Sequence, residues 1–261
     1  MMLPICREIR EDILKVSKAS KQGHIPTSFS IVEILYAVYT AIKNDPANPS
    51  WQERDIFILS KGHGALAHYC VLAELNYFPK DGLCFFGAFM SKYGCHADRC
   101  KVPGIEVSSG SLGHGIGIAV GMALALKLKK SSRRVFVLVG DGEANEGSVW
   151  EAIMAAVSLK LDNLTVIFDY NRSQIRGLQI DNPVERFISF GCESLLVDGH
   201  NVRSLKTQIS KKSDKVKVIV AETQKGFGCK TLIENQWEWH RKSPTDEEFG
   251  NLVKELNEKA V

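Results

Sequence analysis

Two polar segments that follow buried strand patterns hold the residues best suited to chemistry. Asp141 lies in a Gly-Asp-Gly sequence directly after the apolar run 135–139, and Asn171 follows the apolar run 164–168. They are thirty positions apart (171 − 141), the length of one strand–helix–strand unit, so neighbouring strand ends should present both side chains. Oxygen-only ligands, one of them neutral, suit Mg²⁺ or Ca²⁺ rather than zinc.

Such a cation predicts a phosphate ester or diphosphate as ligand. The glycines beside Asp141 let the backbone approach an anion, and the following helix offers free N–H groups. On its own, Gly-Asp-Gly would more readily be a tight turn, and the spacing to Asn171 favours the ligand site instead. Two other phosphate-binding motifs are absent from the sequence. No glycine is followed by lysine, as a P-loop requires, and the alternate glycines at 113–117 lack the third glycine of a dinucleotide fingerprint.

Alternating strand and helix patterns must position these residues. The strand patterns lack polar alternation, as expected for a parallel sheet covered on both faces, so the fold class is α/β with helices on both sides. Strands are expected at 55–59, 135–139, 164–168, 195–197 and 216–220, with helices at 65–76, 110–130, 148–160 and 202–211. About 50 N-terminal residues read as helical, and Ser30 with Glu33 predicts a capping box. No linker divides the chain, which predicts a single domain over residues 1–261.

Composition excludes several function classes. Lys and Arg number 33 against 30 Asp and Glu, without a dense basic block, so a nucleic-acid partner is not expected. Residues 107–126 are uncharged, but five glycines and three serines make a membrane span a poor interpretation. Seven cysteines and no export signal predict reduced thiols in the cytoplasm. Cys95 and Cys100 flank a histidine, yet no second ligand pair supports a zinc site.

Together these motifs resemble a known family. Gly140-Asp141-Gly142 with Asn171 looks like the thiamine diphosphate motif, and other segments resemble transketolase in particular. Those segments are Gly23-His24, Ser60-Lys61-Gly62-His63-Gly64, Gly110-Ser111-Leu112-Gly113 and Trp239-His240. The resemblance runs from about residue 20 to 245 and covers only the N-terminal, diphosphate-binding part of a transketolase. It therefore implies the N-terminal subunit of a split, two-gene transketolase.

The resemblance implies a cofactor site. Mg²⁺ (or Ca²⁺) would be held by Asp141, Asn171 and the backbone carbonyl of Ser173. The groups that would contact thiamine diphosphate are the backbone N–H groups of Gly142 and Glu143, the aminopyrimidine-facing Gly110 and Leu112, and the imidazoles of His63 and His240.

It also implies a substrate site. His63 and His240 would contact substrate as well, while His24 and His96 would bind the hydroxyl and carbonyl oxygens of the donor sugar. Glu146 and Glu151 would line the contact with the partner's active site. Arg241 follows His240 where glycine or an aromatic is more usual, and such departures near the substrate funnel leave the sugar unassigned.

The implied reaction transfers a two-carbon ketol unit from a ketose or ketose phosphate to an aldehyde, with the cofactor as electron sink. A C-terminal partner subunit would supply the pyrimidine-binding domain, the catalytic glutamate and the basic residues for the sugar phosphate, in an α₂β₂ assembly. The chain alone would catalyse nothing. Two alternatives stay open: a subunit resembling a 2-oxoacid dehydrogenase that feeds an acyl carrier, and a non-catalytic subunit that has kept the fold.

Overall fold

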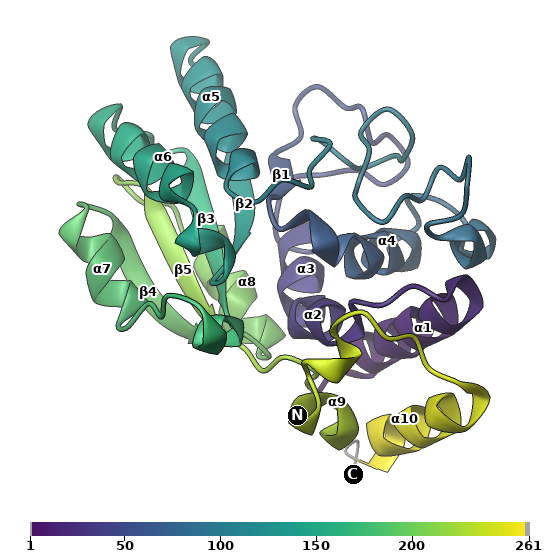
Figure 1. Cartoon of the computed structure of the whole chain (residues 1–261). Helices are drawn as coiled ribbons and strands as arrows, with labels where there is room; N and C mark the ends of the chain where they lie inside the picture. Colours follow the sequence, from purple (N-terminus) through teal and green to yellow (C-terminus); the bar gives the residue numbers. More distant parts are fainter. Residues whose placement is uncertain (1, 259–261) are drawn as a thin grey trace.

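One parallel five-stranded sheet forms the centre of the molecule. The computed structural model describes residues 2–258, and all of its strand pairs are parallel, in the order β1-β2-β3-β5-β4 (Figure 1). The strands are β1 (Ile56–Leu59), β2 (Val135–Gly140), β3 (Leu164–Tyr170), β4 (Glu193–Asp198) and β5 (Lys217–Glu222). The predicted α/β class is confirmed, because each expected apolar run forms a strand of this sheet.

Helices cover both faces, so the strands divide their side chains between two cores. Along β2, Phe136 and Leu138 enter one core, and Val135, Val137 and Val139 enter the other. The first core lies under α1 (Pro4–Ser20), α2 (Ile25–Ser30), α3 (Val32–Tyr39), α4 (Ala65–Glu74) and α8 (Val202–Ser210). The second lies under α5 (His114–Leu128), α6 (Gly147–Ser158) and α7 (Pro183–Ser189). The C-terminal α10 (Asp246–Glu258) packs beside α1, and α9 (Lys230–Glu234) packs against α2 (Figure 1).

The predicted capping box at Ser30 is wrong. Ser30 is the last residue of α2, and α3 follows Ile31 with no side-chain cap. The Ser30 hydroxyl instead donates to Asp169 Oδ1 at 2.9 Å, and the Glu33 carboxylate pairs with Arg10 at 2.6 Å. Buried charged partners bind these groups more strongly than a neutral helix terminus would.

The helix expected over residues 110–130 begins only at His114. Gly113 has a φ of +77°, a left-handed conformation that suits glycine, and residues 110–113 form a loop before α5. This loop belongs to the candidate site. Along α5, Ile118 and Leu128 remain exposed on the outer face, so the helix is buried on one side only.

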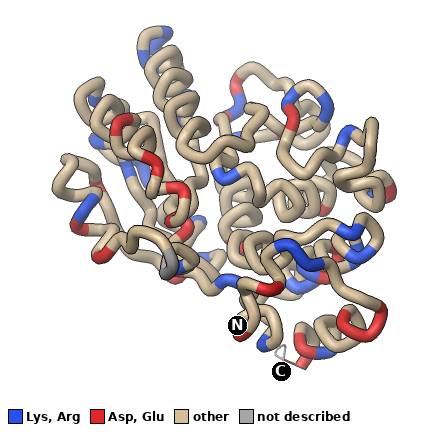
Figure 2. The backbone as a smooth tube through the Cα atoms, in the orientation of Figure 1, with Lys and Arg blue, Asp and Glu red and all other residues tan. Residues whose placement is uncertain are grey.

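Charges are spread over the described chain without a single-sign stripe. Figure 2 shows Lys and Arg interspersed with Asp and Glu on most helices and loops. Within residues 2–258, no helix has the length and apolar character needed to cross a membrane.

Candidate active site

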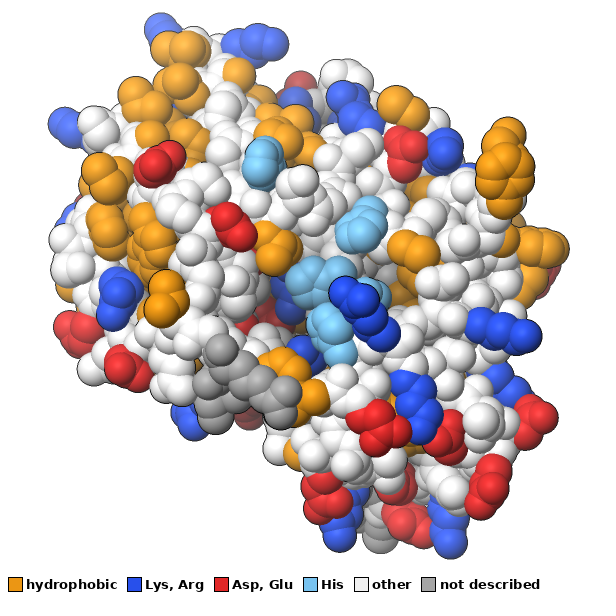
Figure 3. Space-filling model, in the orientation of Figure 1, with side chains coloured by type: hydrophobic (Ala, Val, Ile, Leu, Met, Phe, Trp, Pro, Cys, Tyr) orange, Lys and Arg blue, Asp and Glu red, His pale blue; other side chains and the backbone are white. Residues whose placement is uncertain are grey.

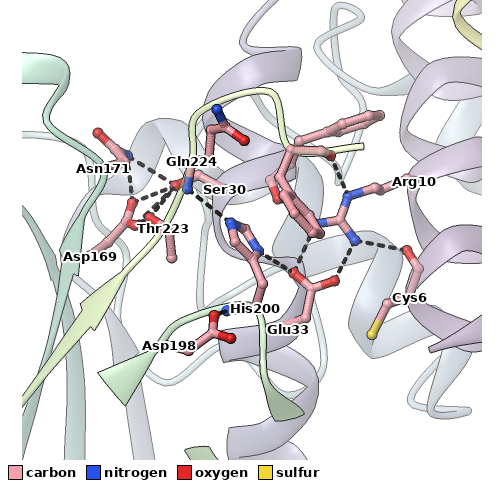
Figure 4. Close-up of polar contacts among 12 residues, drawn as sticks. Cys6, Arg10, Ser30, Glu33, Asp169, Asn171, Asp198, His200, Thr223 and Gln224 are labelled. Carbon is pink, nitrogen blue, oxygen red and sulfur yellow. Dashed lines mark hydrogen bonds and ion pairs between the residues drawn. The ribbon is translucent and has the colours of Figure 1, made fainter. Parts of the chain in front are cut away.

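The ends of β2 and β3 bring together Asp141, Asn171 and Ser173. Asp141 Oδ2 and Asn171 Oδ1 both accept the backbone N–H of Ser173, each at 3.0 Å, so the two oxygens converge on one point. The Ser173 hydroxyl also donates to Asp141 Oδ1 at 2.9 Å. Asn171 is oriented from behind, because its amide nitrogen donates to Ser30 Oγ and Asp169 Oδ2 (Figure 4). Its oxygen is therefore free to face Asp141.

The chemistry of this cluster fits a hard cation. Burial and the nearby Asp169 carboxylate raise the pKa of Asp141, so an adjacent positive ion would relieve an unfavourable charge. No group of three His, Cys, Asp or Glu side chains suited to a metal occurs between residues 2 and 258. A cation here would thus have one carboxylate and neutral oxygens, and would need further oxygens from its ligand. Mg²⁺ binds phosphates in this manner.

Glu143 joins three loops of the site. Its carboxylate accepts the Ser60 hydroxyl at 2.5 Å and the backbone N–H groups of Gly113 and Gly140 at 2.9 and 3.1 Å. The side chain thus ties the loop after β1 to the start of α5 and the end of β2. The Gly142 N–H, expected to face a diphosphate, donates here to Asp141 Oδ1 at 2.7 Å.

Three of the predicted histidines form a compact cluster. The His24 ring lies 4.8 Å from that of His240 and 5.8 Å from that of His63, measured between centroids. The His24 backbone N–H donates to the His240 carbonyl at 3.0 Å, which joins the segment before α2 to the one before α10. Both His24 Nδ1 and His240 Nδ1 are buried without a hydrogen-bond partner in the described structure. Buried unpaired nitrogens of this kind indicate a place for a ligand.

These imidazoles are neutral near pH 7. Burial, assisted by the charge of Lys61, lowers the pKa of His63 to about 2. Burial and the neighbouring His240 and His96 lower the pKa of His24 to about 4. Burial also lowers the pKa of His240. A neutral ring has one donor and one acceptor nitrogen, so it can both give and take a proton from sugar oxygens.

His96 and Gly110 lie together at the edge of this cluster. His96 is exposed, and its ring packs on Gly110, where an added Cβ would be 3.5 Å from the ring. A Cβ on Gly62 would lie 2.8 Å from the Gly110 backbone, so the two loops are in close contact there. The Leu112 carbonyl is 3.0 Å from His114 Nδ1.

Glu146 and Glu151 differ from the histidine cluster in their environment. Both are exposed, Glu146 at the residue that precedes α6 and Glu151 within that helix. Neither shifts the pKa of a clustered histidine.

Two buried lysines belong to the site: Lys61, which lies in a motif segment but was given no role from the sequence, and Lys225, which was missed. Lys61 pairs with Asp169 at 2.5 Å, and its charge acts on His63. Lys225 is only 6% exposed, and burial together with the Lys61 charge lowers its pKa to about 8. Lys225 follows the end of β5, so the rule that singled out Asp141 could have found it. The two cations make this end of the sheet attractive to an anion.

A second buried network supports the loop that holds Lys225. Arg10 and Glu33 form a fully buried ion pair, and His200 Nδ1 lies 2.9 Å from Glu33 Oε2 (Figure 4). His200 Nε2 accepts the backbone N–H of Gln224 at 2.8 Å, and its ring stacks on Phe227. His200 lies in the turn after β4, and its ring connects α3 to the loop after β5.

Known proteins match this chain over nearly its whole length. The profile described as the transketolase, thiamine diphosphate binding domain matches residues 5–256. A subunit of an apulose-4-phosphate transketolase from Actinobacillus succinogenes is 39% identical, over 97% of this chain and 94% of its own. A 6-deoxy-6-sulfo-D-fructose transketolase subunit from a Clostridium species is 38% identical, over 92% of this chain and 90% of its own.

Larger transketolases match only in part. The mouse transketolase is 36% identical over 95% of this chain, which spans 41% of that protein. The crystal structure of the Campylobacter jejuni transketolase superposes with a TM-score of 0.88 at 27% identity, over 98% of this chain and 43% of that one. The chain thus spans less than half the length of these relatives.

Proposed function

Because the chain belongs to the family of transketolase thiamine diphosphate-binding domains, we propose that it is the diphosphate-binding subunit of a two-subunit transketolase. The reaction is transfer of a two-carbon ketol unit from a ketose or ketose phosphate to an aldehyde. One observation carries the proposal: converging Asp141 and Asn171 oxygens lie beside a buried, cationic and imidazole-rich site with unpaired nitrogens.

The residues present fit the cofactor. Mg²⁺ (or Ca²⁺) would be held by Asp141, Asn171 and the carbonyl of Ser173. The diphosphate would be faced by Lys61, Lys225, His63, His240 and the backbone N–H groups of Gly142 and Glu143, and the aminopyrimidine by Gly110 and Leu112. When bound, thiamine diphosphate supplies the carbon nucleophile and electron sink that ketose cleavage requires.

The chain itself contributes position and proton transfer. His24 and His240 present neutral, unpaired nitrogens that can bind the hydroxyl and carbonyl oxygens of a sugar and exchange protons with them. His96, at the exposed edge of the cluster, would bind the same donor sugar. Glu143 keeps the three loops in register, so that the imidazoles and the cation site stay at fixed separation.

A partner subunit completes the enzyme in this proposal. Relatives that match over nearly their full length are named as transketolase subunits, which supports a second chain. That chain would supply the pyrimidine-binding domain and the catalytic glutamate, in an α₂β₂ assembly. Glu146 and Glu151, both exposed, would lie toward it. The scattered cysteines, predicted to be reduced thiols, support a cytoplasmic site of action.

Co-expression with a candidate C-terminal subunit tests the proposal. We expect the pair, with thiamine diphosphate and Mg²⁺, to transfer ketol units from xylulose 5-phosphate and not to release carbon dioxide from pyruvate. Asp141→Ala should abolish Mg²⁺-dependent cofactor binding in calorimetry, whereas Asp45→Ala, in the loop between α3 and β1, should not. Turnover of pyruvate would favour the 2-oxoacid alternative. Unchanged activity in Asp141→Ala would favour a non-catalytic subunit.

A further inference from the structure

The backbone of Arg241 is fixed beside the histidine cluster. Its backbone packs so closely on Gly23 that a Cβ there would lie 2.4 Å from the Arg241 carbonyl carbon. The preceding carbonyl, of His240, accepts the His24 N–H at 3.0 Å. The Arg241 backbone is thus held against the segment that carries His24, while its side chain is exposed.

The Arg241 side chain is a cation beside the histidines that solvent can reach. Lys225 and Arg241 are the two cationic side chains that act on His24, and Lys225 is buried. Figure 3 shows most histidine side chains gathered near the centre of this face, with a Lys or Arg side chain against them at the surface. The charge of Arg241 acts on His240 as well.

This charge is not neutralised by a neighbouring carboxylate. Among the ion pairs of residues 2–258, none includes Arg241. The next residue, Lys242, is different: its ammonium lies 2.8 Å from Glu238 and 2.6 Å from Glu248. Of these two adjacent cations, the half-buried Lys242 is paired with carboxylates of the protein, and the exposed Arg241 is available to a ligand.

We propose that Arg241 binds the anionic end of the substrate, a phosphate or sulfonate on the sugar chain, and so favours charged over neutral ketoses. This inference rests on the proposed function. With its reacting carbonyl end at His24 and His240, a sugar would extend its far end toward solvent, on the side of the exposed Arg241. Guanidinium groups bind tetrahedral oxyanions through paired hydrogen bonds. The two subunit relatives described above are named for a phosphorylated and a sulfonated sugar.

Arg241 would add a cation on this chain to those that the partner subunit is expected to supply. We therefore expect Arg241 to have its own effect on substrate specificity. Its removal should act on the affinity for a charged sugar rather than on the rate of the chemical step.

Paired donors in the reconstituted two-subunit enzyme test the inference. Xylulose 5-phosphate is compared with xylulose, and 6-deoxy-6-sulfofructose with fructose, using neutral glycolaldehyde as the acceptor. We expect Arg241→Gln to lower the charged-to-neutral ratio of kcat/KM by about tenfold or more, mainly through KM. Arg241→Lys should retain an intermediate ratio, and Lys242→Gln should keep that of the wild type.

Three results would overturn the inference. Equal losses for charged and neutral donors would show that Arg241 only positions His240. An unchanged ratio would show no contact with the anion. Loss of the complex between the two chains in size-exclusion chromatography would show that Arg241 binds the partner. If the wild-type pair uses none of the four donors, the proposed function fails instead, before any variant is compared.

Discussion

At the residue scale, the imidazoles of the site lose basicity because they are removed from water and placed beside cations. His63 is the strongest case, with its ring near Lys61 and His24. A histidine whose pKa is lowered by folding takes up a proton more readily in the unfolded chain. The site therefore makes the fold sensitive to mild acid.

This sensitivity gives a first prediction. Unfolded histidine titrates near pH 6.5, whereas folded His24 and His63 have pKa values of about 4 and 2. The more deeply buried His63 ring should therefore cost the fold about 1.4 kcal/mol per pH unit as pH falls below about 6.5, and the half-buried His24 ring should cost less, because solvent screens its charge. The loss should stop near pH 4 for His24 and continue below that for His63. Urea unfolding of His24→Asn and His63→Asn between pH 7.5 and 4.5 should give flatter stability curves than the wild type.

Curves parallel to the wild type in both variants would contradict this account. A flattening in only one of the two would assign the acid sensitivity to that ring.

At the element scale, α5 contains glycines with opposite surroundings. A Cβ on Gly115 would lie 2.7 Å from the Ser60 Cα, where the loop after β1 meets the helix. A Cβ on Gly121 would meet nothing within 4 Å. Gly115 thus permits a close helix–loop contact, and Gly121 only lowers the helix propensity of α5.

A matched pair of substitutions tests this difference. We expect Gly115→Ala to destabilise the chain by about 1–3 kcal/mol through overpacking. Gly121→Ala should stabilise it by about 0.5–1 kcal/mol, because alanine loses less backbone entropy in a helix. Denaturant unfolding of the isolated chain measures both values. Similar effects at the two positions would show that the contact with Ser60 can relax.

The ion pair between α1 and α3 supports the loop after β5. Arg10 donates to both Glu33 oxygens, at 2.6 and 2.7 Å, and to the backbone carbonyls of Phe29 and Phe227. Burial alone would raise the pKa of Glu33, but Arg10 and His200 outweigh it and lower the pKa to about 2. A lowered carboxyl pKa stabilises the fold above the unfolded value near pH 4.3. That contribution is lost as pH falls toward 2.

Breaking this pair on one side should be costly. We expect Glu33→Gln to destabilise the chain by about 3–5 kcal/mol, since it leaves the Arg10 charge buried without a counter-ion. The double variant Arg10→Met with Glu33→Leu should recover most of the loss. Urea denaturation at pH 7 measures both. A loss below about 1 kcal/mol for Glu33→Gln would mean that water or another group reaches Arg10.

At the scale of the whole molecule, the sheet joins the two cores. Strand β2 places alternate side chains in each, so neither core can lose its packing while the other keeps the sheet. We propose that the chain is a single domain and unfolds in one step. Trp150 stacks on Phe187 in one core, and Trp239 is buried in the other.

Fluorescence can follow each core separately. One variant keeps only Trp150 and the other keeps only Trp239, with phenylalanine at the other tryptophans. In each variant, the denaturation midpoint measured by tryptophan fluorescence should equal the midpoint measured by circular dichroism. Separate midpoints would divide the chain into two units.

Much of this architecture is predictable because apolar runs mark buried strands. The five strands follow from that pattern, as do α4, α5, α6 and α8 and the meeting of Asp141 with Asn171, whereas α7 between β3 and β4 was not predicted. The position of β5 between β3 and β4 could not be predicted, because an apolar run does not indicate which strands lie beside it in the sheet. The roles of Lys61 and His200 depend on contacts between distant segments, which local patterns cannot reveal.

The left-handed backbone at His24 limits how the specificity of this protein could be redesigned. With a φ of 66°, this position accepts glycine or asparagine, whereas a β-branched residue would force the segment to rebuild. Gly23 beside it has no room for any larger side chain. A mutant library meant to alter sugar preference should therefore diversify position 241 and keep positions 23 and 24 constant.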